Sequence, residues 1–176
     1  MCCHLAFPAL MRSPKLYEDF AYEEKMPRVS AGLLTFKRLG DELQVFLVHP
    51  GGPFWRNKDL GSWTVPKGEV RDHEDALCCA RREFKEETGH EATGDFIGLG
   101  EVRQAGGKVI KAWAVEGDCS EEIRSNTFSM EWPPKSGRRQ EFAEVDRAAW
   151  FSVNEARERM NQAQTLFLDR LVAELT

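Results

Sequence analysis

The sequence predicts an α/β/α sandwich in which a mixed β-sheet lies between helices, and three observations lead to this fold class. Residues 28–36 and 43–49 are apolar runs with the length of buried strands. Residues 73–88 repeat apolar side chains at three- and four-residue steps, as an amphipathic helix does. Residues 154–174 carry two further short helical patterns. Helices are therefore expected in the middle and at the end of a chain otherwise made of strands.

The length of 176 residues fits one domain with a single core. Residues 1–27 show no sustained periodicity, and we expect them to form an N-terminal extension to a folded domain at residues 28–176. Met26 is an alternative start of the chain, and an ordered arm packed on the domain is the alternative to a tail.

The remaining elements follow from turn signals and alternation. A glycine turn at residues 37–41 separates the first two strands, and residues 50–60 form a loop rich in glycine and proline before the helix. After the helix we expect strands at 95–104 and 108–115, a short helical excursion at 118–125, and strands at 128–132 and 148–151.

The central helix has recognisable ends and one strongly acidic face. Asp72 is the predicted N-cap, and Gly89 suits the left-handed position after the last turn. Glu83, Glu86 and Glu87 lie within one turn of each other on this helix.

Three carboxylates this close repel one another, and a divalent cation would relieve the repulsion. Hard oxygen ligands without a neighbouring His or Cys favour Mg²⁺, with Mn²⁺ as the second choice. Because Mg²⁺ is usually shared with phosphate oxygens, a phosphorylated small molecule is the expected substrate. The alternative is a solvated acidic face with pairs such as Arg82 to Glu86.

The segment before the helix reads as a ligand-binding loop. In Pro66-Lys67-Gly68 the glycine lets the backbone approach a ligand, and Lys67 adds a positive charge for phosphate.

Seven residues at fixed spacing carry a family resemblance. They are Gly68, Glu74, Arg82, Glu83, Glu86, Glu87 and Gly89. This pattern resembles the Nudix box, the signature of the Nudix hydrolase family. The departure is His90, where the family prefers an aliphatic residue. The resemblance implies the Nudix α/β/α sandwich and an enzyme that hydrolyses pyrophosphate bonds.

The resemblance also implies roles for individual residues. Metal ligands would come from the helix and from the loop, where the carbonyl of Lys67 beside Gly68 joins them. The catalytic set that it implies is Glu83, Glu86 and Glu87, with Arg82 orienting the carboxylates and Glu144 as a further ligand or general base. Glu141 is the second choice to Glu144, Glu74 would anchor the loop, and Glu86 or Glu87 competes with Glu144 as the base.

Two groups of cations outside the box are predicted to bind the substrate. Trp55, Arg56 and Lys58 could stack on a base and hold phosphates, and Arg138 and Arg139 lie together in an expected loop. A solvent loop with one packed tryptophan and a solvated basic turn are the alternatives.

The function expected from the resemblance is Mg²⁺-dependent hydrolysis of a nucleoside diphosphate linked to another group. A nucleoside triphosphate or a dinucleoside polyphosphate leads as the substrate, ahead of nucleotide sugars, ADP-ribose and diphosphoinositols. The alternative is a non-catalytic module that binds nucleotides on the same fold.

The composition excludes several other classes of protein. A net charge of −5 argues against general nucleic-acid binding. No apolar run approaches the ~18 residues of a membrane span. Five cysteines, an odd number, argue against a disulfide framework and favour the cytoplasm. A monomer or a homodimer is expected.

Overall fold

A computed structural model describes residues 28–176, so the expected extension at 1–27 lies outside the described residues. The main sheet contains, in spatial order, β4 (Phe96–Arg103), β5 (Val109–Glu116), β1 (Val29–Leu39), β2 (Glu42–Pro50) and β8 (Val145–Ser152). The short strand β3 (Lys67–Glu69) pairs with β1. β1 runs parallel to β5 and antiparallel to β2, which makes the sheet mixed as predicted.

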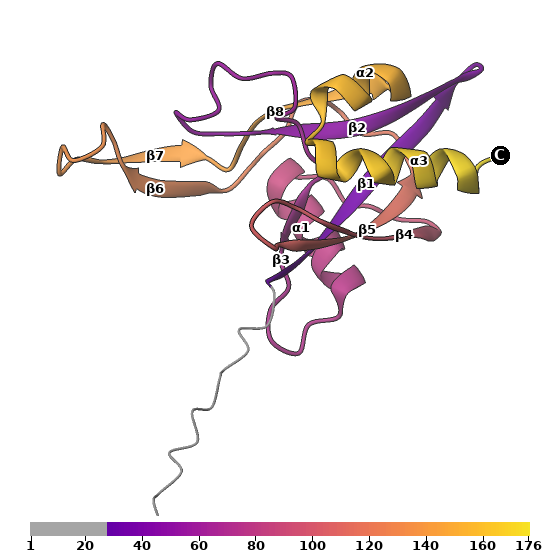
Figure 1. Ribbon diagram of the computed structural model, residues 1–176, viewed down its shortest axis with the longest axis horizontal. Helices are drawn as coiled ribbons and strands as arrows, with labels where there is room; N and C mark the ends of the chain where they lie inside the picture. The colour runs from indigo at the N-terminus through magenta and orange to yellow at the C-terminus, as the bar shows by residue number, and fades with distance from the viewer. Residues whose placement is uncertain (1–27) are drawn as a thin grey trace, which may run out of the picture.

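Helices cover both faces of this sheet, so β1 is buried on both sides (Figure 1). Leu34 and Phe36 face a core shared with α2 (Val153–Arg159) and α3 (Thr165–Glu174). Ala31 and Leu33 face a second core shared with α1 (Ala76–Thr88). Burial on both faces explains why β1 reads as a continuous apolar run. The predicted α/β/α sandwich is confirmed.

Helix α1 starts later than the sequence pattern suggested. Its N-cap is Asp75, whose carboxylate accepts hydrogen bonds from the N–H groups of Leu77 and Cys78 at 3.0 Å, so the assignment of Asp72 was wrong. His73 has a positive φ of 63°, which a helix cannot accommodate. The predicted end is confirmed, because Gly89 has φ 79° and its N–H bonds to the carbonyl of Lys85.

The predicted helical excursion at 118–125 was also wrong, because this segment contains no helix. It runs instead beside β8 and supplies that strand with polar partners. The Trp150 N–H donates to the carboxylate of Glu121 at 2.9 Å, and the Trp150 indole donates to the carbonyl of Cys119 at 3.0 Å. Tertiary hydrogen bonds thus replace the local ones of a helix.

A hairpin of β6 (Thr127–Glu131) and β7 (Arg139–Ala143) extends from the body of the protein (Figure 1). β7 was not predicted, and Arg139, which was placed in a loop, pairs with Glu131 at the start of that strand. The C-terminal pattern resolves into α2, a 3₁₀ turn (Gln162–Gln164) and α3. Between residues 28 and 176 no helix is long and apolar enough to cross a membrane.

Candidate active site

The loop before α1 lies directly against the acidic face of the helix. β3 pairs antiparallel with β1 and places Gly68 opposite Ala31. A Cβ atom added to Gly68 would lie 1.9 Å from the carboxyl carbon of Glu83. The glycine is therefore required because the Glu83 carboxylate occupies the space that any side chain would need. The sequence predicted a close approach here, but with a ligand rather than with this carboxylate.

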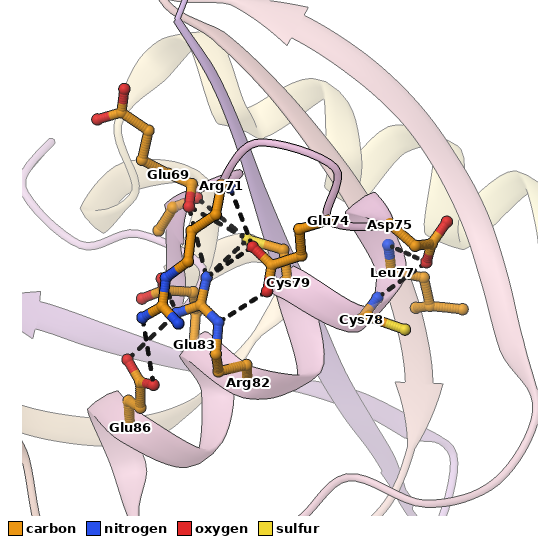
Figure 2. A network of polar contacts seen from close by, with 11 residues as sticks. Glu69, Arg71, Glu74, Asp75, Leu77, Cys78, Cys79, Arg82, Glu83 and Glu86 are labelled. Atoms are coloured by element: carbon orange, nitrogen blue, oxygen red, sulfur yellow. Dashed lines mark hydrogen bonds and ion pairs between the residues drawn. The ribbon is translucent and has the colours of Figure 1, made fainter.

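Arg82 holds the acidic residues of this region in place (Figure 2). Its guanidinium donates two hydrogen bonds to the Glu74 carboxylate, at 2.8 and 2.9 Å. The remaining terminal nitrogen donates to Glu83 at 2.5 Å and to Glu86 at 3.3 Å. Glu74 also accepts a hydrogen bond from the Arg71 N–H at 3.0 Å. One arginine thus ties the turn before α1 to two carboxylates on the helix.

This pairing gives a testable contribution of Glu74 to stability. The hydrogen bonds from Arg82 lower the pKa of Glu74 to about 2, against an ordinary value of 4.5. A depressed folded-state pKa stabilises the fold above pH 4.5, and the contribution disappears as the pH falls towards 2. With solvent screening, Glu74→Gln should lower the free energy of unfolding by about 1–2 kcal/mol at pH 7. Urea denaturation at pH 7 and near pH 2 measures this, and an equal loss at both pH values would contradict it.

Glu87 is a half-buried carboxyl that touches the loop main chain. Its carboxylate accepts a hydrogen bond from the Lys67 N–H at 3.0 Å. Burial raises the pKa of Glu87 to about 7, and the charges of Glu83 and Glu144 add to this, although the Lys67 ammonium opposes it. Glu87 therefore changes its charge near neutral pH in the metal-free protein.

Glu144 is distant in sequence from Glu83, Glu86 and Glu87, yet it lies near them. These four carboxylates are called the acidic group. Glu144 follows β7, where its N–H donates to the carbonyl of Asn126 at 2.8 Å. Burial raises the pKa of Glu144, and the negative charges of Glu83 and Glu86 raise it further. The fold thus brings Glu144 close enough to interact with carboxylates more than fifty residues earlier.

The described residues, 28–176, contain no group of three or more His, Cys, Asp or Glu side chains arranged to hold a metal ion. In this arrangement Glu83 and Glu86 bind Arg82, and Glu87 binds the Lys67 N–H. The donor set nevertheless suits a hard divalent cation, because it consists of carboxylate oxygens beside a glycine that leaves room for them. Burial, with a smaller contribution from neighbouring carboxylates, raises the pKa of Glu87 and of Glu144, and a bound cation would favour their charged forms.

Besides a hollow lined by Arg81, Arg82, Lys85 and Glu91, two further hollows flank α1. The one beside the carboxylates is shallow, has a volume of about 510 Å³, and is lined by Glu69, Val70, Arg71, Asp72 and Glu83. The other is a more enclosed cavity of about 180 Å³ between α1 and the end of β5. Its lining includes Glu91, Glu116 and Asp118 but no Lys or Arg, so it does not suit a phosphate. The hollow beside the carboxylates contains Glu83, one of the predicted metal ligands.

Of the predicted substrate-binding residues, Lys67 lies beside Glu87, while the other five lie on two segments outside the acidic group. Lys58 sits 4.6 Å above the ring of Trp55, and Arg56 is exposed on the same loop. Arg139 donates to the Oγ and carbonyl oxygen of Ser129, at 3.1 and 2.9 Å, and Arg138 precedes it at the end of the hairpin.

The sequence interpretation missed a pair of aromatic side chains that joins these two segments. Phe54 of the loop and Trp132 of the hairpin make an edge-to-face contact with ring centroids 5.4 Å apart. The available signal was an aromatic residue in each of two proline-containing turns. No local pattern says that the two turns meet.

A mixed sheet that carries a glycine loop against an acidic helix defines a class of protein, the Nudix domain. The model of the NUDIX domain family matches residues 26–171. The chain therefore belongs to the Nudix family and is a hydrolase of pyrophosphate bonds by class. A search of curated proteins gives no match.

Solved structures with a similar fold include three that cover most of the chain. A C. elegans Ap4A hydrolase in a binary complex is 19% identical, with a TM-score of 0.61 over 83% of this chain and 97% of that one. The NUDIX domain of Shewanella oneidensis NrtR complexed with ADP ribose is 17% identical, with a TM-score of 0.62 over 86% and 90%. A MutT protein from Methanosarcina mazei Go1 is 20% identical, with a TM-score of 0.58 over 87% and 98%. At these identities the similarity shows the fold alone.

Proposed function

We propose that the protein hydrolyses a pyrophosphate bond in a nucleoside diphosphate linked to another group, with a divalent cation as cofactor. A nucleoside triphosphate or a dinucleoside polyphosphate is the substrate. The observation that carries this proposal is the convergence of the helix carboxylates and Glu144 beside the Lys67-Gly68 loop, which fits the hydrolysis of a phosphate anhydride.

Glu83, Glu86, Glu87 and the main-chain carbonyl of Lys67 would hold Mg²⁺, or Mn²⁺ in its place. When bound, such an ion neutralises phosphate oxygens and lowers the pKa of water.

The residues of the chain itself have separate tasks in this proposal. Arg82 positions Glu83 and Glu86, and it is anchored in turn by the bidentate contact with Glu74. Burial raises the pKa of Glu87 to about 7 and also raises that of Glu144, and a raised pKa suits a group that accepts a proton from the attacking water. Glu144 has no hydrogen bond to the loop main chain like that of Glu87, so we assign it the role of base.

The cations outside the box would bind the phosphates that are not cleaved. Lys67 lies in the loop next to Glu87, while Arg56 and Lys58 belong to the loop after β2. Arg138 and Arg139 come from the hairpin that leads to Glu144. A polyphosphate chain carries several negative charges, so a substrate with three or more phosphates would use more of these cations than a diphosphate.

A panel of phosphorylated compounds tests the proposal. The purified chain is incubated with and without Mg²⁺ with canonical and 8-oxo nucleoside triphosphates, Ap4A, ADP-ribose, a nucleotide sugar and a diphosphoinositol, and the products are separated. We expect turnover of a triphosphate or of Ap4A that requires the metal. Cleavage of the diphosphoinositol alone would refute the substrate class, and absence of any cleavage would refute the enzyme.

A nucleotide-binding module without catalysis is the second function that an observation favours. In the described arrangement the carboxylates bind Arg82 and the Lys67 N–H, and one similar structure is a NUDIX domain of NrtR complexed with ADP ribose. This function predicts that a compound of the panel raises the melting temperature without being cleaved.

A further inference from the structure

We propose that Phe54 and Trp132 form a binding site for the base of the nucleotide substrate. This inference rests on the proposed function, and it names the residues that would bind the base of that substrate. Neither residue belongs to the Nudix box, and they are 78 positions apart in the sequence.

The loop that carries Phe54 is fixed at both ends beside the acidic group. At its start the Gly51 N–H donates to the carbonyl of Glu144 at 2.9 Å. A Cβ atom at Gly51 would lie 2.0 Å from the carbonyl oxygen of Ala143, so only glycine allows this contact. Near its end the Lys58 carbonyl oxygen lies 2.8 Å from the ring Nε2 of buried His49. The loop is therefore held against the base of the hairpin, as Figure 1 shows.

The aromatic pair lies within reach of a nucleotide whose phosphates are at the carboxylates. Phe54 is three residues from Gly51, so the two Cα atoms are at most about 11 Å apart. Gly51 in turn contacts the carbonyl of Glu144, and the next residue, Val145, packs in the same buried cluster as Phe84, which is adjacent to Glu83 on α1. Phe54 is thus three residues along the loop from a main-chain contact with Glu144, and the same loop carries Arg56 and Lys58.

The geometry of the pair leaves ring surface free for stacking. The ring planes of Phe54 and Trp132 meet at 86°, and in an edge-to-face pair the ring that offers its edge keeps both faces clear of its partner. The Phe54 side chain remains 56% exposed, so a large part of its surface is open to a ligand. Trp55, the residue that the sequence suggested for stacking, already has the Lys58 ammonium over its ring.

The charge around the pair favours a nucleotide over other aromatic ligands. Arg56 and Lys58 follow Phe54 on the loop, and Lys135 and Arg138 follow Trp132 around the hairpin turn. Cations next to exposed rings suit a ligand that joins an aromatic base to phosphates. A diphosphoinositol has the phosphates, but its ring is not aromatic and cannot stack on Phe54 or Trp132.

Steady-state kinetics with three substrates test the site. They are a nucleoside triphosphate, Ap4A and inorganic tripolyphosphate, which has the anhydride bonds but no base. For Phe54→Ala and Trp132→Ala we expect KM for the two nucleotides to rise about 5- to 150-fold, with kcat little changed. KM for tripolyphosphate should stay within twofold. Phe54→Trp should restore the nucleotide KM, and Leu60→Ala, at a more exposed apolar position of the same loop, should change nothing.

Three results would overturn the base site. One is an equal rise in KM for tripolyphosphate, which would make the pair a support for the loop. Another is an unchanged nucleotide KM in Phe54→Ala. The third is a loss of self-association in Phe54→Ala by light scattering, which would make the pair a contact between two copies of the chain. Because Trp132→Ala could loosen the hairpin, melting temperatures are compared, and Phe54→Ala decides if the two variants disagree.

Calorimetric binding of a non-hydrolysable nucleoside triphosphate separates this site from the proposed activity. Suppose the wild-type protein cleaves nothing but binds this compound, and Phe54→Ala weakens the binding. This result supports the base site and refutes the hydrolase. If the wild-type protein cleaves nucleotides and Phe54→Ala binds and cleaves them equally well, the result supports the hydrolase and refutes the base site.

Discussion

Glu87→Gln is expected to lower kcat by about a hundredfold to ten-thousandfold and to leave the fold intact. The amide oxygen of glutamine can still accept the hydrogen bond from the Lys67 N–H, so the loop keeps its contact with α1. The variant loses only the negative charge that the proposed function requires at this position. Turnover of the best substrate of the panel measures the effect. Glu174→Gln, the same substitution at an exposed site on α3, is the matched control.

The same variant should be more stable than the wild type without metal at high pH. Because burial raises the pKa of Glu87 from 4.5 to about 7, folding favours its protonated form. The metal-free wild type therefore loses stability as the pH rises from about 4.5 to about 7, by about 1–3 kcal/mol. Glu87→Gln has no such loss, so its melting temperature in EDTA at pH 8 should exceed that of the wild type. A lower value at every pH would mean that Glu87 supports the fold rather than the activity.

Gly68→Ala is expected to lower kcat/KM by about a hundredfold, because the new methyl group takes the place of a carboxylate. The added Cβ would lie 2.0 and 2.2 Å from the carboxylate oxygens of Glu83 as well as close to its carboxyl carbon. Either Glu83 or the loop must move, and a shift of about 1 Å near reacting groups can cost this much in rate. Overpacking should also lower the free energy of unfolding by about 1–3 kcal/mol.

Gly98→Ala provides the control for this effect. Gly98 lies on β4, and the atom nearest to a Cβ there would be the indole nitrogen of Trp113, 4.0 Å away. We expect its kinetics to match those of the wild type. If Gly68→Ala were equally active, Glu83 would not need its observed position, and the assignment of Glu83 to metal binding would fail.

Local sequence patterns correctly predicted the elements that depend on residues close together in the chain. The period of α1, its glycine end and the spacing of its carboxylates could be read directly, because residues three and four apart share one face of a helix. The fold class followed because a strand buried on both faces must be apolar throughout. These expectations agree with the structure.

Most of the errors fall where long-range contacts override local preference. At the start of α1 the deviation is local, because His73 has a positive φ of 63° and Asp75 caps the helix instead of Asp72. The segment 118–125 is not helical, and its acceptors on Glu121 and Cys119 bind Trp150 of β8 instead. β7 is short and mostly exposed, so it shows no apolar alternation, and only its partner β6 defines it as a strand.

The Nudix family, the acidic helix and the residue types for phosphate chemistry could be predicted from residue spacing along the chain. The packing of Gly68 against Glu83, the approach of Glu144 to the helix carboxylates and the contact of Phe54 with Trp132 became visible only in the fold. The reason is physical. Each of these contacts joins segments that the sheet and the hairpin bring together, and a side chain carries no local mark of the partner that folding will place beside it.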